Sequence, residues 1–407
     1  MPLRALDQSS KLKNVLYEIR GKALEEVARL EADGYEVLKL NTGNPAAFGF
    51  QAPHQIVRDV VAAIPQAHGY TDSRGILSAR RAIVTRYETE PGFPEIDVDD
   101  VYLGNGVSEL ITMVMQALLD EGDEVLIPSP DYPLWTAMTS LSDGRPVHYR
   151  CDESNGWAPD LDHIRELITP RTKALVVINP NNPTGAVYSR EVLEGIAAIA
   201  REHSLLLLSD EIYDRILFDG AVHTPMATVA PDLLCLTFNG LSKTYRVAGY
   251  RSGWLVITGP RDHATGFLEG ITLLASTRLC PNVPAQHAVQ AALGGVQSID
   301  GLIAPGGRLH EQREIAWKGL TTIPGVTCVR PDGALYLFPR LDPEVHEIHD
   351  DARLVYDLLV SEHILLVQGT GFNWPDPDHL RIVTLPEARV LAEAVERLGN
   401  FLSSYRQ

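Results

Sequence analysis

The chain contains few cysteines and no arrangement of them that signals a metal. Only four occur among 407 residues, and they stand far apart, at Cys151, Cys235, Cys280 and Cys328. No two form a C-x-x-C pair, so there is no zinc signature, and we expect no metal site. Their sparse use is typical of a reducing compartment. The first 21 residues also lack the apolar core of a signal peptide, so we expect a cytoplasmic protein.

Positive charge and long apolar runs are also scarce. Lysine and arginine number 35 against 53 acidic residues, which gives a net charge of −18 and a pI near 5.1. Binding to a phosphate backbone needs clustered basic residues, so this balance argues against nucleic acid or an anionic membrane as the main partner. No apolar run approaches the roughly 20 residues of a membrane span.

The residues that are present predict a folded α/β protein. The composition is 45% hydrophobic and 22% charged, which is typical of a globular chain of two or three domains. Several apolar runs alternate with stretches of helical periodicity, which predicts a mostly parallel central sheet covered on both faces. The expected strands are 101–104, 123–128, 173–180, 205–214 and 233–240.

The pattern changes after the glycines at 306–307, where short spaced strands occur among helices. We therefore expect a large α/β domain over residues 51–305 and a smaller α+β domain over residues 306–407. The N-terminal segment, residues 1–50, carries helical spacing at 21–33. It could pack on either unit, and we expect it to pack with the small domain and over the active site.

Polar side chains follow three of the expected strands. Asn182 follows the strand "ALVVI", Asp210 and Tyr213 follow "LLLLS", and Lys243 follows "LLCLTF". Ligands of open α/β sheets bind outside the carboxyl ends of the strands, so these side chains should converge on one crevice. A glycine turn, "NGVSEL" at 105–110, opens a helix whose free backbone N–H groups can bind phosphate.

This set of groups suits pyridoxal 5′-phosphate (PLP). A lysine forms a Schiff base with its aldehyde, and an acid partners its pyridine nitrogen. Asp210 would hold the proton on that nitrogen, while Asn182 and Tyr213 could hydrogen-bond the phenolate oxygen of the ring. Tyr132, in "SPDYPLW", could stack on the ring face.

The order of these motifs resembles the class I aminotransferases of the PLP-dependent fold type I superfamily over essentially the whole chain. The matching stretches are "NPNNPTG", "SDEIY", "GLSK" followed eight residues later by Arg251, and "HLRIVTLP". The sequence is most similar to the bacterial glutamate–pyruvate (alanine) aminotransferases. The stretches that carry this likeness are "GNPAAFGF", "PDYPLW", "NPNNPTGAVY", "NGLSKTYRVAGYRSGW" and "RLCPNVPAQHA".

The resemblance implies a role for each matching residue. Lys243 would be the Schiff-base lysine and proton shuttle, and Arg381 would bind the substrate α-carboxylate as a fork. Gly43 would let the substrate approach the backbone, and Asn182 would also contact it. The implied cofactor contacts are Gly106, Val107, Ser108, Tyr132, Asn182, Asp210, Tyr213, Ser242 and Arg251. Tyr70 would reach the phosphate of a neighbouring subunit, which implies a homodimer.

The sequence departs from the family at two positions and offers three further candidate residues. Many relatives have serine where Gly240 stands, so one phosphate hydroxyl of the family is missing here, and they have a small or apolar residue where Arg246 stands. Arg20, with Tyr17 nearby, could contact the substrate side chain from the N-terminal segment. Arg278 is a weaker candidate for a contact across the dimer.

The expected activity is a ping-pong transfer of an amino group between L-alanine/pyruvate and 2-oxoglutarate/L-glutamate. A transaminase of aromatic or branched amino acids, a valine/pyruvate enzyme or a C–S β-lyase on the same fold are alternatives. A nicotinamide-dependent dehydrogenase is disfavoured because Glu109 replaces the third glycine of "GNGVSE". A non-catalytic regulator would need a DNA-binding module, and little sequence lies outside the core fold.

Overall fold

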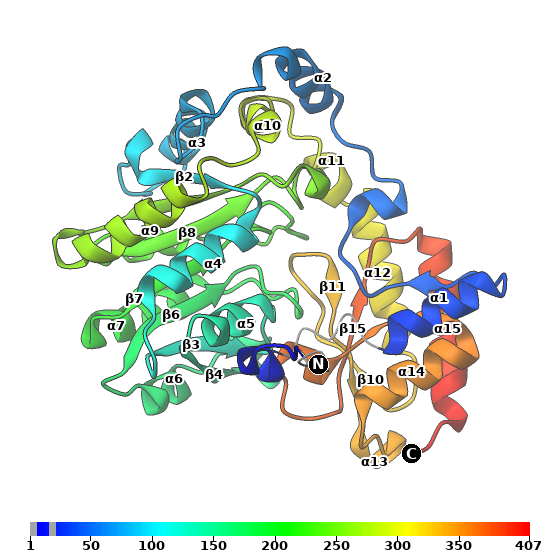
Figure 1. The fold of residues 1–407 in the computed structure, drawn as a ribbon. Coiled ribbons are helices and arrows are strands. Elements are labelled where there is room, and N and C mark those ends of the chain that lie inside the picture. Colours follow the sequence, from blue (N-terminus) through cyan, green and yellow to red (C-terminus); the bar gives the residue numbers. More distant parts are fainter. Residues whose placement is uncertain (1–5, 16–21) are drawn as a thin grey trace, which may run out of the picture.

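The computed structural model describes residues 6–15 and 22–407, which form two lobes (Figure 1). A cavity lies between the lobes. One lobe contains an eight-stranded sheet covered by helices. The other contains short strands surrounded by four longer helices. The predicted α/β class with a mostly parallel sheet is confirmed.

The large sheet has the strand order β2-β9-β8-β7-β6-β3-β4-β5. Strands β8, β7, β6, β3 and β4 are mutually parallel, whereas β9 runs antiparallel to both β2 and β8, and β5 antiparallel to β4. The strands are β2 (Val101–Gly104), β3 (Glu124–Ser129), β4 (Arg145–Asp152), β5 (Ala158–Pro159), β6 (Thr172–Ile178), β7 (Leu206–Asp210), β8 (Cys235–Gly240) and β9 (Gly253–Thr258). Sequence analysis did not predict β4, β5 or β9.

Successive residues of each strand lie on opposite faces of the sheet. Helices cover both faces, which explains why the strands appear as apolar runs in the sequence. On one face, Val125 and Leu208 pack with α4 (Val107–Leu118), α5 (Leu134–Leu141) and α9 (Thr265–Thr277). The helices of the opposite face are α3 (Leu77–Glu88), α6 (Leu161–Leu167), α7 (Arg190–His203), α8 (Met226–Val229) and α10 (Val283–Gly294). Helix α2 (His54–Ala63) packs on α10 at the edge of this lobe.

The second lobe contains the N-terminal helix as well as the C-terminal part of the chain. Val27 and Leu30 of α1 (Lys22–Ala32) share a core with residues 316–402. Strand β1 (Leu38–Lys39) pairs in parallel with β13 (Ile364–Leu365). Earlier in the segment, the short helix η1 (Ser10–Asn14) instead contacts α5 of the large lobe, and Lys11 pairs with Asp143 at 2.8 Å, so the boundaries at 1–50, 51–305 and 306–407 stay a proposal. The remaining helices are α11 (Asp300–Ile303), α12 (Arg308–Leu320), α13 (Pro343–His346), α14 (Asp351–Glu362) and α15 (Ala388–Ser404).

Among the described residues, the second lobe contains five further short strands. They are β10 (Val326–Thr327), β11 (Tyr336–Leu337), β12 (Arg340–Leu341), β14 (Val367–Gln368) and β15 (Leu380–Val383). The order β11-β15-β14 is antiparallel throughout. Tyr336 of β11 and Arg381 of β15 line the same cavity as the loops after β6, β7 and β8. Both lobes therefore contribute side chains to one site.

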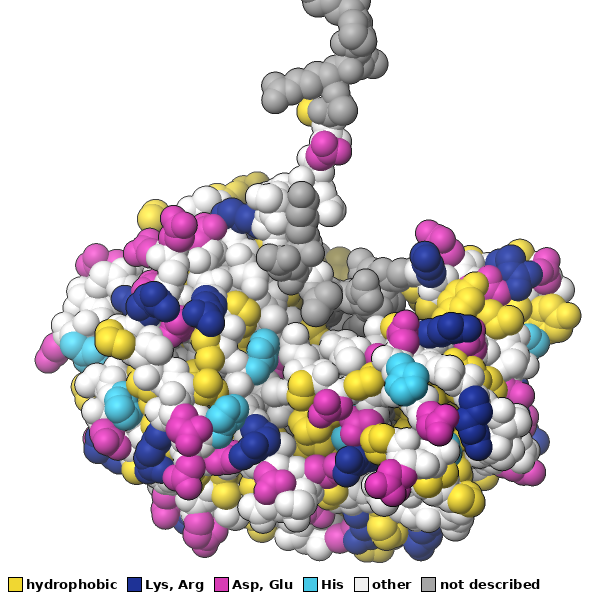
Figure 2. Space-filling model, turned by 90° about the horizontal axis from the view of Figure 1, so that it is seen from below, with side chains coloured by type: hydrophobic (Ala, Val, Ile, Leu, Met, Phe, Trp, Pro, Cys, Tyr) yellow, Lys and Arg dark blue, Asp and Glu magenta, His cyan; other side chains and the backbone are white. Residues whose placement is uncertain are grey.

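The surface carries charges of both signs. On the face shown in Figure 2, acidic and basic side chains are interspersed, with small apolar areas between them. Within residues 6–15 and 22–407, no helix is long and apolar enough to cross a membrane. All four cysteines are free thiols, and Cys151 and Cys235 are buried.

Candidate active site

A cavity lies between the carboxyl ends of the parallel strands and the second lobe. It encloses about 950 Å³ of space, part of which is open to solvent. Its lining consists of Asn41, Thr42, Gly43, Val107, Ser108, Ile111, Tyr132, Leu134, Ile178, Asn182, Asp210, Ile212, Tyr213, Ser242, Lys243, Ala248, Arg251, Tyr336 and Arg381. Most of the residues singled out by the sequence motifs therefore converge there.

Lys243 lies in the turn that follows β8, three residues beyond the end of the strand. Its Nζ donates a hydrogen bond of 2.8 Å to the backbone oxygen of Gly43, and it stands 6.0 Å from the ring centroid of Tyr213. The amine is thus held inside the cavity between the two lobes, where a ligand can reach it.

Asp210 is the last residue of β7 and is 3% exposed. The indole Nε1 of Trp135 donates to Asp210 Oδ2 at 3.1 Å, which fixes the plane of the carboxylate. Burial raises the pKa of Asp210 to about 6, although the hydrogen bond from Trp135 opposes that rise. A cationic ring nitrogen would compensate this buried negative charge.

The N-terminus of α4 and Arg251 form an anion cradle. Gly106 is the N-cap of this helix and has a φ of 82°, a backbone conformation that residues other than glycine rarely adopt. The backbone N–H groups at the start of the helix have no intrahelical acceptor, and the helix dipole favours an anion there. Arg251 Nη2 donates to Ser108 Oγ at 3.0 Å, which brings a cation to the same place.

Arg381 projects from β15 with its guanidinium between two aromatic rings. The centroid of Tyr336 is 4.6 Å from the guanidinium carbon, and that of Phe372 is 4.5 Å away. Arg381 Nη1 donates to Asn182 Oδ1 at 3.2 Å, and Nη2 donates to the backbone oxygen of Asn41. A planar fork held in this way suits recognition of a carboxylate.

A match to family models and to known proteins agrees with this arrangement. Residues 35–398 match the model of the family described as aminotransferase class I and II. The chain is 70% identical over 404 residues to the alanine aminotransferase of Mycobacterium tuberculosis H37Rv, covering 99% of this chain and 94% of that protein. It is 59% identical to the glutamate–pyruvate aminotransferase of Escherichia coli K12, with 99% of both chains covered.

The chain belongs to the class I and II aminotransferases. A solved aminotransferase of Escherichia coli superposes with a TM-score of 0.98 at 59% identity, covering 99% of this chain and all of that one. The resemblance inferred from the motifs is confirmed, and the protein is an aminotransferase. The family, as a class, depends on PLP.

The motifs had not assigned two residues of this aminotransferase's site. Trp135 is the last residue of the quoted "PDYPLW", and Tyr336 lies in the strand "ALYLFP". Trp135 contacts Asp210, and Tyr336 contacts both Tyr213 and Arg381. Each is an aromatic residue in an apolar run, so the sequence pattern alone assigns it to the core.

The two departures from the family receive a structural explanation. A Cβ on Gly240 would lie 2.9 Å from Gly253 Cα and 2.9 Å from the oxygen of Ser252, so strands β8 and β9 leave no room for serine. Arg246 does not line the cavity. Its guanidinium instead donates to the backbone oxygen of Gln51 at 3.2 Å and to Ser298 Oγ at 2.7 Å.

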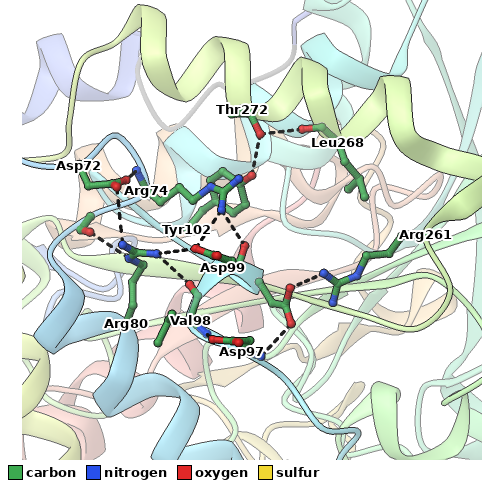
Figure 3. A network of polar contacts seen from close by, with 12 residues as sticks. Asp72, Arg74, Arg80, Asp97, Val98, Asp99, Tyr102, Arg261, Leu268 and Thr272 are labelled. Atoms are coloured by element: carbon green, nitrogen blue, oxygen red, sulfur yellow. Dashed lines mark hydrogen bonds and ion pairs between the residues drawn. The ribbon is translucent and has the colours of Figure 1, made fainter.

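Tyr70 stands apart from the cavity and is 83% exposed. A polar network fixes the backbone that follows it (Figure 3). Arg80 donates to the Val98 oxygen at 3.0 Å and pairs with Asp72 at 3.7 Å, while Arg74 pairs with Asp99 at 3.2 Å. The exposed phenol thus projects from an ordered loop.

Arg278 takes part in the support of the same loop. It forms an ion pair with Glu109 and donates to the backbone oxygen of Ser73 at 2.8 Å. Its side chain is 16% exposed, so most of it is engaged within its own subunit. The remaining candidates, Tyr17 and Arg20, lie outside the described residues.

We expect Asp210→Asn to stabilise the cofactor-free protein while weakening cofactor binding. Folding raises the pKa of Asp210 from 3.8 to about 6, so the folded state holds a proton that the unfolded state releases between these values. Stability therefore falls as the pH rises through this window and levels off above it. Asparagine does not titrate, so the variant avoids this loss. Its free energy of unfolding should exceed that of the wild type by up to about 3 kcal/mol at pH 7.

Urea unfolding of both cofactor-free proteins between pH 4 and 7.5 measures this difference. The two stabilities should be close near pH 4 and diverge as the pH rises. A wild-type protein that is the more stable of the two at pH 7 would contradict the expectation.

Proposed function

We propose that this aminotransferase uses PLP to transfer an amino group between L-alanine/pyruvate and 2-oxoglutarate/L-glutamate by a ping-pong mechanism. The observation that carries the proposal is the convergence of Lys243, Asp210 and Arg381 on one cavity. An amine, a buried carboxylate and a guanidinium are the groups that a PLP-dependent reaction of an α-amino acid requires.

The cavity suits an anionic cofactor. Among the described residues that line it, three are cationic, Lys243, Arg251 and Arg381, and one is a carboxylate, Asp210. The phosphate fits the start of α4 beside Arg251, and the ring nitrogen fits the buried Asp210. Ser242, next to Lys243 in the same lining, offers a further hydroxyl. The donor set therefore fits PLP.

Each residue has a role in this proposal. PLP, when bound, supplies the electron sink for bond cleavage at the substrate α-carbon. Lys243 Nζ removes the α-proton as general base and returns a proton later in the cycle. Asp210 keeps the ring nitrogen protonated, and Asn182 and Tyr213 hydrogen-bond the ring oxygen. Tyr132, which also lines the cavity, packs against the ring face.

Substrate orientation depends on Arg381, which binds the α-carboxylate shared by both amino acids. Gly43 leaves the backbone open on the substrate side. The two substrates differ in their side chains, since alanine has a methyl group and glutamate a second carboxylate. The choice of this pair is supported by the activities in the names of the two relatives at 70% and 59% identity.

We further propose a cytoplasmic homodimer in which Tyr70 reaches the phosphate site of the neighbouring subunit. An isolated tyrosine that is 83% exposed, on a loop held by several ion pairs, suits a contact with another chain. The same lobe also exposes apolar side chains that suit such an interface, at Val57, Val61, Ile64, Leu77, Leu273 and Leu279. Four free thiols support a reducing location.

An absorbance spectrum of the purified protein tests the proposed reaction. The bound cofactor should give a band in the visible or near-UV that shifts with L-alanine and returns with 2-oxoglutarate. Lys243→Ala should lose this cycling. A band that ignores alanine but responds to an aromatic or branched amino acid, or to cystathionine, would retain the cofactor and replace the substrate. No band after addition of PLP would contradict the cofactor assignment.

Hybrid dimers test the role of Tyr70. Co-expressed Lys243→Ala and Tyr70→Ala subunits, carrying different tags, should form a hybrid with one complete site and about half the wild-type activity. Each parent dimer should be impaired: Tyr70→Ala should lose roughly tenfold in cofactor affinity, as expected for one charged hydrogen bond. Measured at a PLP concentration that leaves the Tyr70→Ala dimer mostly unloaded, a hybrid no more active than the mean of its parents would exclude a contribution across the interface.

A further inference from the structure

Tyr336 brings a second phenol into the cavity beside Tyr213. The two hydroxyl oxygens are 2.6 Å apart, and the rings meet edge to face with centroids 5.8 Å apart. Both residues are nearly buried, Tyr213 at 2% and Tyr336 at 3% exposure. A separation of 2.6 Å between buried hydroxyls is a hydrogen bond in which one tyrosine donates and the other accepts.

The Tyr336 hydroxyl has little freedom to turn elsewhere. A Cβ built on Gly43 would lie 2.2 Å from it, so the backbone of Gly43 closes one side. The guanidinium of Arg381 covers the ring, 4.6 Å from its centroid. Packing thus directs this hydroxyl toward Tyr213 and keeps it there.

The charges around the pair establish which tyrosine holds its proton more tightly. Burial, together with Tyr336, raises the pKa of Tyr213 well above its usual range. Burial alone would raise the pKa of Tyr336. The net effect is a lowered pKa, because the charges of Lys243 and Arg381 and the hydrogen bond with Tyr213 outweigh burial. Tyr132 adds to the rise in the pKa of Tyr213. Tyr336 is therefore the more acidic phenol of the pair and the better hydrogen-bond donor, while Tyr213 holds its own proton tightly.

We propose that Tyr336 is a positioning residue that directs the Tyr213 proton to the ring oxygen of the bound cofactor. This inference rests on the proposed function. Tyr213 has one proton, so when it donates to the ring oxygen, its 2.6 Å contact persists only if Tyr336 donates in turn. Hydrogen bonds in such a chain polarise one another, and the bond from Tyr213 to the ring oxygen becomes stronger.

This chain has a measurable consequence for the pH dependence of the cofactor's absorbance. A stronger donor stabilises the anionic ring oxygen, so the cofactor loses its shared proton at lower pH. Tyr336→Phe keeps the ring beneath Arg381 and removes only the donor. The titration midpoint of the cofactor in this variant should rise by roughly 0.1 to 0.7 pH unit, the share of a charged hydrogen bond that such cooperativity supplies.

The experiment is a pH titration of the cofactor band in wild type, Tyr336→Phe, Tyr213→Phe and the double variant. Tyr213→Phe should raise the midpoint more than Tyr336→Phe does. The double variant should match Tyr213→Phe, since Tyr336 acts only through Tyr213. Additive shifts, an unchanged midpoint in Tyr336→Phe, or a lowered one would each overturn the proposal. A lowered midpoint would mean that Tyr336 competes for the Tyr213 proton.

A matched control separates this effect from a general loss of packing. Tyr149 is fully buried outside the cavity, and its hydroxyl donates to the backbone oxygen of Val176 at 2.8 Å. Tyr149→Phe should lower thermal stability and leave the midpoint unchanged. A shift in this control would overturn the assignment to Tyr336. A wild-type protein with no cofactor band would instead contradict the proposed function, and this result is distinct from a failure of the role given to Tyr336.

Discussion

The buried carboxylate of Asp210 is the constraint on which the arrangement of the site depends. A negative charge at the end of β7, 3% exposed, is unfavourable unless a positive group compensates it. Trp135 supplies a hydrogen bond but no charge. The buried charge therefore lowers the stability of the cofactor-free protein. The same charge favours the binding of a ligand that carries a positive charge at this point.

The second lobe completes the site, and hydrogen bonds join it to the large lobe next to the cavity. Asn373 Nδ2 donates to Asp131 Oδ1 at 2.7 Å, and the Asp131 N–H donates to the oxygen of Phe372 at 2.9 Å. Asp131 precedes Tyr132, and Phe372 packs on Arg381. The contacts that join the lobes therefore also fix the side chains assigned to the cofactor ring and to the substrate carboxylate. Movement between the lobes would change both together.

The sequence predicts those parts of the site that follow a strand in a recognisable motif. Asp210, Asn182 and Lys243 were found because each follows an apolar run, and parallel strands place their carboxyl ends on one edge. Tyr336 was not assigned, because a tyrosine among apolar residues looks like any core aromatic. Its role depends on a contact between the lobes. The hydroxyl of Tyr213 is 2.6 Å away, although the two residues are 123 positions apart in the sequence.

The fold was predictable to a similar extent. The apolar runs predicted the parallel strands β3, β6, β7 and β8, but β4, β5 and β9 were missed, although β9 (Gly253–Thr258) is itself an apolar run. The fit of β9 against β8 then explains Gly240, which the family comparison had presented only as a missing serine. Local pattern predicts elements, whereas close approach between backbones becomes evident only in three dimensions.

The most direct test of this account is to identify the lysine that carries the cofactor. Borohydride reduction of the PLP-loaded protein fixes the cofactor to that lysine, and mass spectrometry of a peptide digest then locates it. The account predicts the added mass of the reduced cofactor on the peptide that contains Lys243. Modification of another lysine, with Lys243 unmodified, would contradict it.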